Sequence, residues 1–120
     1  MANEITAQAG MQVSKGGVSE SLSGSSNVTM AGANVLKATQ TIATAATQLA
    51  LTGITGIPPC LVVHNLDAAN YVEIDSANTF DKFPQKVLAG GYAILWPETA
   101  TIWLKAHTAS VQVQYLASEP

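Results

Sequence analysis

Residues 4–14 alternate between apolar and polar side chains almost without interruption. The apolar members occupy every second position: Ile5, Ala7, Ala9, Met11 and Val13. A period of two is typical of a β-strand with one face against protein and the other in water. The same period returns at residues 111–115. The sequence therefore predicts a chain that begins and ends on half-buried strands.

Turn-forming residues divide the chain into about ten short strands, spaced at about eight to twelve residues. This spacing is typical of a β-sandwich or barrel. A parallel α/β fold would need helical crossovers, and the sequence offers no convincing candidate for one. We therefore predict an all-β fold, an antiparallel sandwich or jelly-roll-like single domain with an extended N-terminal strand or arm.

Two segments before residue 52 can be interpreted in more than one way. Residues 18–30 predict a meander, with strands at 18–22 and 27–30 around a Gly-Ser-Ser-Asn turn. Residues 35–51 contain enough Ala, Leu and Gln for a helix, but their many Thr residues favour a pleated strand. We predict two strands there, at about 35–43 and 46–51, and keep a helix as the alternative.

The composition changes near residue 57. No aromatic residue precedes it, and all seven follow it: Tyr71, Phe80, Phe83, Tyr92, Trp96, Trp103 and Tyr115. Aromatic side chains bury the largest areas, so residues 57–120 predict the compact core, and residues 1–56 an arm or the first part of the sandwich. The chain is best treated as one domain, 1–120. The predicted core residues are Val72, Ile74, Ile94, Leu104, Val111 and Val113.

Charge is scarce: charged residues make up 11% of the chain, the net charge is -3, and there is no Arg. Nucleic-acid binding needs a basic patch, and none is visible. The low charge favours a subunit packed against others over a monomer, because few ions would have to be desolvated. No run approaches the length of a membrane span, and no secretion signal is readable at the N-terminus. We predict no nucleic-acid partner and no membrane partner.

Few residues could carry out chemistry. Cys60 is the single cysteine and predicts a buried, inert thiol. His64 and His107 have no spacing that supports a metal site. Glu73 and Asp75 could form a pair of carboxylates for glycan hydrolysis, but their alternation with Val72 and Ile74 favours a solvated outer face. We predict a protein that is not an enzyme and has no cofactor, metal or small-molecule substrate.

Two sets of residues are candidates for contact with other molecules. Ile5, Met11 and Val13 would be inter-subunit contacts if the opening strand crosses onto a neighbouring subunit, where an added strand gains main-chain hydrogen bonds. Trp96 and Trp103 lie on neighbouring predicted strands. They could be anchors in the core or at an interface, or could form a platform on which a sugar stacks.

Several stretches together resemble the small virion proteins of tailed bacteriophages. The chain opens Met-Ala-Asn-Glu-Ile-Thr, continues through the alternating strand to Lys15-Gly-Gly, and later carries Asn-Leu-Asp-Ala-Ala-Asn-Tyr-Val-Glu-Ile at 65–74. Leu-Ala-Gly-Gly at 88–91, Leu-Lys-Ala at 104–106 and Val-Gln-Tyr at 113–115 follow in order. These motifs are structural, and no functional residue is carried over from the resemblance.

The resemblance implies a capsid decoration, or cement, protein with a β-sandwich or jelly-roll core. Such a protein would sit on the outer capsid surface, bridge capsomers and resist the pressure of packaged DNA. Its partners would be the major capsid protein and other copies of itself, as a dimer or trimer. Its location would be the virion, assembled in the host cytoplasm. The alternatives are a tail or neck protein, or a host-recognition module that binds glycan.

Overall fold

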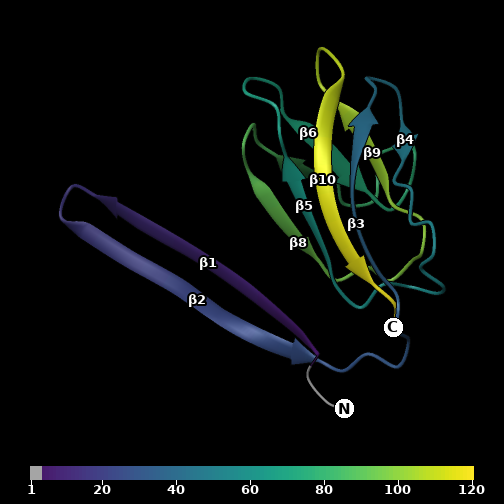
Figure 1. Cartoon of the computed structure of the whole chain (residues 1–120). Coiled ribbons are helices and arrows are strands. Elements are labelled where there is room, and N and C mark those ends of the chain that lie inside the picture. The colour runs from purple at the N-terminus through teal and green to yellow at the C-terminus, as the bar shows by residue number, and fades with distance from the viewer. Residues whose placement is uncertain (1–3) are drawn as a thin grey trace.

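The computed structural model describes residues 4–120, which form a projecting hairpin and a β-sandwich (Figure 1). Every regular element within this range is a strand. The strands are β1 (Ile5–Lys15), β2 (Val18–Val28), β3 (Val35–Ile42), β4 (Thr47–Gln48), β5 (Leu61–Asn65), β6 (Val72–Asp75), β7 (Gln85–Val87), β8 (Tyr92–Leu95), β9 (Trp103–Ala106) and β10 (Val111–Ser118). The all-β prediction is confirmed, and residues 35–51 form two strands with no helix between them.

The sandwich has the strand order of a jelly roll. One four-stranded sheet runs β3-β10-β5-β8 and the other runs β4-β9-β6-β7, with every pair antiparallel. Four of the pairs are nested one inside the next: β3 with β10, β4 with β9, β5 with β8, and β6 with β7. Eight strands wound in this way are the double-sheet jelly roll.

The core lies between the two sheets and is built by the residues that alternate inward. Its fully buried aliphatic side chains are Ile42, Leu49, Leu61, Val63, Val72, Leu104, Val111 and Val113. Ile74 is also buried, so five of the six predicted core residues are correct. The prediction for Ile94 is wrong, because its pairing with Val62 places it on the outer face of β8, where it is half-buried.

The hairpin is a two-stranded ribbon that projects from the sandwich (Figure 1). Its ladder runs without interruption from the Ile5–Val28 pair to the Lys15–Val18 pair. Gly16 and Gly17 close it with φ values of 60° and 84°, the two positive values that a type I′ turn requires. The predicted turn at 24–27 is wrong, because β2 continues through it. Ser25 and Ser26 lie opposite Gln8 and Ala7 in the ladder, so the preference of Ser for turns does not end the strand here.

The prediction that the opening strand is half-buried is also wrong. Ala7 is buried and Ile5 half-buried, but the rest of β1 is exposed on both faces. The sandwich itself begins with β3 and β4, both of which precede residue 57. The change of composition near residue 57 therefore does not coincide with the edge of the sandwich.

Candidate functional site: the projecting ribbon and its groove

The ribbon has two chemically distinct faces. Residues that are opposite each other in the ladder point to the same side, so odd positions of β1 share a face with even positions of β2. One face carries only small or uncharged polar residues: Thr6, Gln8, Gly10, Gln12, Ser14, Ser19, Ser21, Ser23, Ser25 and Asn27. The other, here called the apolar face, carries Ile5, Ala7, Ala9, Met11, Val13, Lys15, Val18, Glu20, Leu22, Gly24, Ser26 and Val28.

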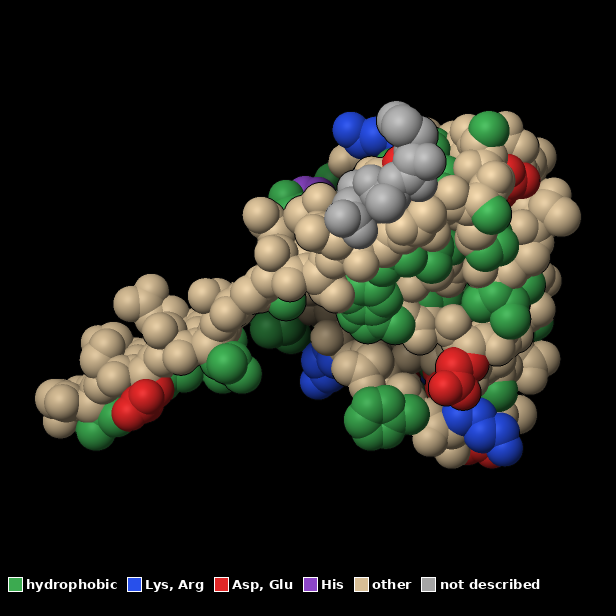
Figure 2. Space-filling view, turned by 90° about the horizontal axis from the view of Figure 1, so that it is seen from below, with side chains coloured by type: hydrophobic (Ala, Val, Ile, Leu, Met, Phe, Trp, Pro, Cys, Tyr) green, Lys and Arg blue, Asp and Glu red, His purple; other side chains and the backbone are tan. Residues whose placement is uncertain are grey.

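The apolar face is uncovered along the outer half of the ribbon. Met11 is 70% exposed and Leu22 is 82% exposed, although both are large apolar side chains. Hydrophobic side chains gather along one side of the projecting ribbon and on the nearby surface of the body (Figure 2). A two-stranded ribbon is at best marginally stable alone in water, and this one leaves large apolar side chains exposed to solvent.

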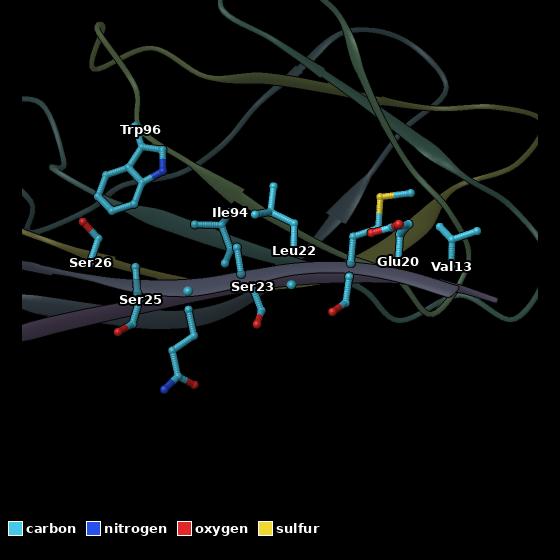
Figure 3. A pocket seen from close by; sticks show the side chains of 15 residues that line it. Val13, Glu20, Leu22, Ser23, Ser25, Ser26, Ile94 and Trp96 are labelled. Carbon is cyan, nitrogen blue, oxygen red and sulfur yellow. The ribbon is translucent and has the colours of Figure 1, made fainter. Parts of the chain in front are cut away.

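A groove of about 830 Å³ lies between the ribbon and the sandwich. Ile94 and Trp96, on and just after β8, form its wall on the sandwich side, and residues of both ribbon strands form the other wall. Figure 3 shows Leu22, Ile94 and Trp96 on the same side of the ribbon, with Ser23 and Ser25 pointing the opposite way. The groove is therefore lined by the apolar face, and Glu20 is its single charged residue.

The outer surface of the β3-β10-β5-β8 sheet is also poor in charge. Alternation places Lys37 there as its single charged side chain, in one row with Leu116, Val62 and Ile94. Leu116 remains 44% exposed. The outer surface of the opposite sheet differs, because Glu73 lies in register between Lys86 and Lys105. The two sheets therefore present one surface suited to protein contact and one suited to water.

The base of the ribbon is fixed to the sandwich by carboxylates. The backbone N–H of Met30 donates to Glu4 at 3.2 Å, which closes the ribbon where β2 ends. Glu119, after β10, accepts from the backbone N–H groups of Ala33 and Asn34 at 3.1 Å and of Thr55 at 3.2 Å. These bonds join the segment after the ribbon to the 52–57 loop and the C-terminus. Glu119 thus helps to set the direction in which the ribbon leaves the body.

Backbone N–H groups lower the pKa of three carboxylates, Asp67, Asp75 and Glu119. The N–H of Asn34 holds the pKa of Glu119 below its ordinary value of 4.5, with further donation from Thr55 and Ala33 against the effect of burial. Burial raises the pKa of Asp75, but N–H groups of Lys82, Ser76 and Phe83 outweigh it and leave the pKa below 3.8. A depressed folded-state pKa gives stability that is present above the unfolded pKa and lost as the pH falls through the folded one.

We expect the melting temperature to hold down to about pH 5 and to fall as the pH drops below the ordinary carboxylate values of 4.5 and 3.8. The double variant Glu119→Gln/Asp75→Asn should melt lower at neutral pH and lose much of this dependence. Glu98→Gln, a change at an exposed acid after β8, is the matched control. Calorimetry between about pH 7 and 3 measures both, and an unchanged acid limb in the double variant would refute this assignment.

Asp75, His64 and His107 are each held by contacts within the fold. Asp75 is buried and accepts backbone N–H groups from the 76–83 loop, so the prediction that it shares a solvated face with Glu73 is wrong. His64 stacks on Tyr92 with ring centroids 3.9 Å apart, and His107 stacks on Tyr71 at 4.4 Å. Within residues 4–120, no three side chains of His, Cys, Asp or Glu are grouped closely enough to hold a metal ion.

Cys60 is buried, as the sequence predicts, and burial raises the pKa of its thiol even though a hydrogen bond with the backbone of Leu61 opposes the shift. The thiol lines a smaller hollow of about 270 Å³ under the base of the ribbon, together with Ile5, Met30 and Val62. A thiol held in the protonated form is a weak nucleophile. Cys60 is therefore part of the packing between ribbon and sheet.

The five predicted contact residues occupy three places. Met11 and Val13 lie on the exposed ribbon and line the groove, and Trp96, 50% exposed, lies across it. Ile5 is half-buried at the ribbon base. Trp103 is half-buried on β9, in the sheet opposite to β8, so Trp96 and Trp103 do not lie on neighbouring strands.

Leu22 and Ile94 were missed as groove residues. Each could have been found from alternation alone, by extending the pattern of residues 18–22 and by grouping Ile94 with Tyr92 and Trp96 on one face. The part of the chain that the structure describes has no helix long and apolar enough to cross a membrane. Comparison of the chain with protein-family models, with curated proteins and with solved structures finds no match.

Proposed function

We propose that this protein is a non-enzymatic structural protein of a tailed-bacteriophage virion, which binds the outer capsid surface and stabilises the shell by bridging capsomers. The observation that carries the proposal is the ribbon: a long, ordered hairpin that adds almost nothing to the core of its own domain and leaves Met11 and Leu22 uncovered. An element of this kind is expected where it contacts another subunit. The resemblance of the sequence to small virion proteins of tailed phages supports the same assignment.

The mechanism is burial of surface. The sandwich is self-sufficient, because its core cluster contains no ribbon residue. The nearly uncharged outer surface of the β3-β10-β5-β8 sheet can rest on the major capsid protein without desolvating ions. The ribbon, roughly 37 Å long for eleven residues at about 3.4 Å each, reaches a neighbouring subunit. Each copy thus holds two positions on the shell together.

The test is binding of the purified full-length chain to shells assembled from the major capsid protein alone. We expect saturable binding with a fixed ratio of copies to capsomers, and shells that withstand a higher temperature before they open. Sedimentation measures the first and calorimetry the second. Absence of the protein from the shell fraction at micromolar concentration would refute the proposal.

A second candidate function, a host-recognition module that binds glycan, is favoured by one observation. Trp96 is half exposed beside a groove, where an indole ring could stack on a sugar. Titration with host polysaccharide would quench or shift the fluorescence of Trp96 if this function holds, and Trp96→Ala would remove the response. A response to glycan in a chain that does not bind shells would select this alternative.

A further inference from the structure

We infer that the groove beside the ribbon is filled by the ribbon of a second copy of this chain, in a two-fold symmetric dimer. The inference deepens the proposed function and rests on it in one respect, namely that the ribbon works between subunits. It follows from the distribution of side-chain size and charge along the apolar face of the ribbon.

The apolar face is graded in size. Its outer half carries the bulky residues Met11, Val13, Val18 and Leu22. Its inner half carries the small residues Ala7, Ala9, Gly24 and Ser26, followed at the base by the larger Ile5 and Val28. A two-fold axis through the middle of the ribbon reverses the direction of the second copy. The Met11–Leu22 pair of one ribbon then lies over Ala9 and Gly24 of the other, so bulky residues meet small ones in the middle of the ribbon, while the end pair Lys15–Val18 lies over Ile5 and Val28.

The groove covers the small half of this face and extends over the bulky residues Met11, Val13 and Leu22. Its ribbon wall includes Ala7, Ala9 and Gly24, and its opposite wall is Ile94 and Trp96. A second ribbon that enters tip first would place its bulky residues between these walls. The tip itself is Gly16–Gly17, with no side chain to obstruct entry. The groove therefore matches the part of the second ribbon that the symmetry brings into it.

The charges of the two ribbons are also complementary in this arrangement. Lys15 ends the ladder at the tip of the ribbon, and Glu4 precedes the first pair at the base. The reversal places Lys15 of each copy over the Ile5–Val28 pair of the other, next to Glu4. The only other charge on the apolar face, Glu20, falls over the small residues Ala7 and Ser26. No like charges are brought together by the pairing.

The area is sufficient for a specific contact. One ribbon face covers on the order of 350 Å² of flat area, from a length of roughly 37 Å and a width of about 10 Å. The pair covers two such faces together with the Ile94 and Trp96 walls of both grooves. With the relief of the side chains, the total approaches about 1,200 Å², the lower bound of stable interfaces.

The experiment measures the mass of the full-length chain in solution, with no capsid protein present, by light scattering and ultracentrifugation over a range of concentration. We expect a dimer whose formation shifts the fluorescence of Trp96. Met11→Ser/Leu22→Ser should raise the dimer dissociation constant on the order of 100-fold, because four large apolar side chains leave the interface. Ala9→Trp should do the same by filling the groove. Phe83→Ser, which removes an exposed apolar side chain from the loop before β7 and away from the groove, is the matched control and should leave the dimer unchanged.

A charge exchange tests the pairing itself. Glu4→Lys and Lys15→Glu should each weaken the dimer on the order of 10-fold, and an equimolar mixture of the two variants should recover it, because every contact in the mixed dimer joins opposite charges. A monomeric wild-type chain, a trimer, or a mixture that does not recover would overturn the inference. A monomer that still binds shells would leave the proposed function standing, whereas a dimer that does not bind shells would refute that function alone.

Discussion

A chain that lacks residues 1–30 is expected to fold normally and to lose binding to the shell by more than about 100-fold. The fold should survive because the core cluster lies entirely within the sandwich, whose strands begin at Val35. Under the proposed function, binding should be lost because a copy without the ribbon would hold one position on the shell where the intact protein would hold two, and a second linked contact strengthens binding by about 10² to 10⁴-fold.

The measurement pairs sedimentation with shells and thermal unfolding of the free protein. We expect the melting temperature of the shortened chain to stay within about 5 °C of the intact one. Deletion of residues 1–14 alone is a poorer experiment, because it leaves β2 without its partner strand. Gln12→Ala/Ser21→Ala in the intact chain controls for changes to the ribbon that spare its apolar face. Full binding by the shortened chain would show that the ribbon is not the bridging element.

Leu104→Ala is expected to cost about 2 to 5 kcal/mol of the free energy of unfolding. Leu104 is fully buried on β9, between Ile74 of β6 and Thr47 of β4 in register, and faces the opposite sheet. Truncation removes the transfer free energy of the side chain and leaves a cavity that close-packed neighbours fill only in part. The melting temperature should fall by more than about 8 °C in a domain of this size.

Leu116→Ala is the matched control, because it makes the same chemical change on the outer surface of β10, where the side chain is 44% exposed. We expect a loss below about 1 kcal/mol. Denaturant unfolding of both variants gives the comparison. Equal losses at the two positions would contradict the assignment of Leu104 to the core and Leu116 to the outer surface.

The sequence predicts the sandwich well because the alternation of apolar and polar residues follows the two faces of each pleated strand. Val111 and Val113 are separated by a polar residue, and the structure buries both. The Thr-rich segment at 35–51 is resolved in favour of strands, because β3 lies at the edge of a sheet and alternates between half-buried and exposed side chains. Local pattern decides these elements, and the jelly-roll order then follows from pairing the strands in nested order.

The ribbon could not be predicted in full from the alternation of apolar and polar residues. A period of two states that the two faces of a strand differ, but it does not state what covers the apolar one. Met11 and Val13 are patterned like core residues, yet they are 70% and 47% exposed. The prediction for Ile94 fails in the same way, because its strand has the pattern of a core strand but Ile94 lies on the outer face. The roles of Asp75 and Glu119 depend on loops distant in sequence, and no local pattern encodes them.

We propose that this protein covers and joins the surfaces of other subunits through a pleated ribbon. The most direct test is an image of the assembled virion at a resolution that traces strands. The account predicts jelly-roll density on the outside of the capsid, with a two-stranded ribbon extending from each copy onto a neighbour. Density for this chain only in the tail or neck, or particles that contain no copy of it, would contradict the account.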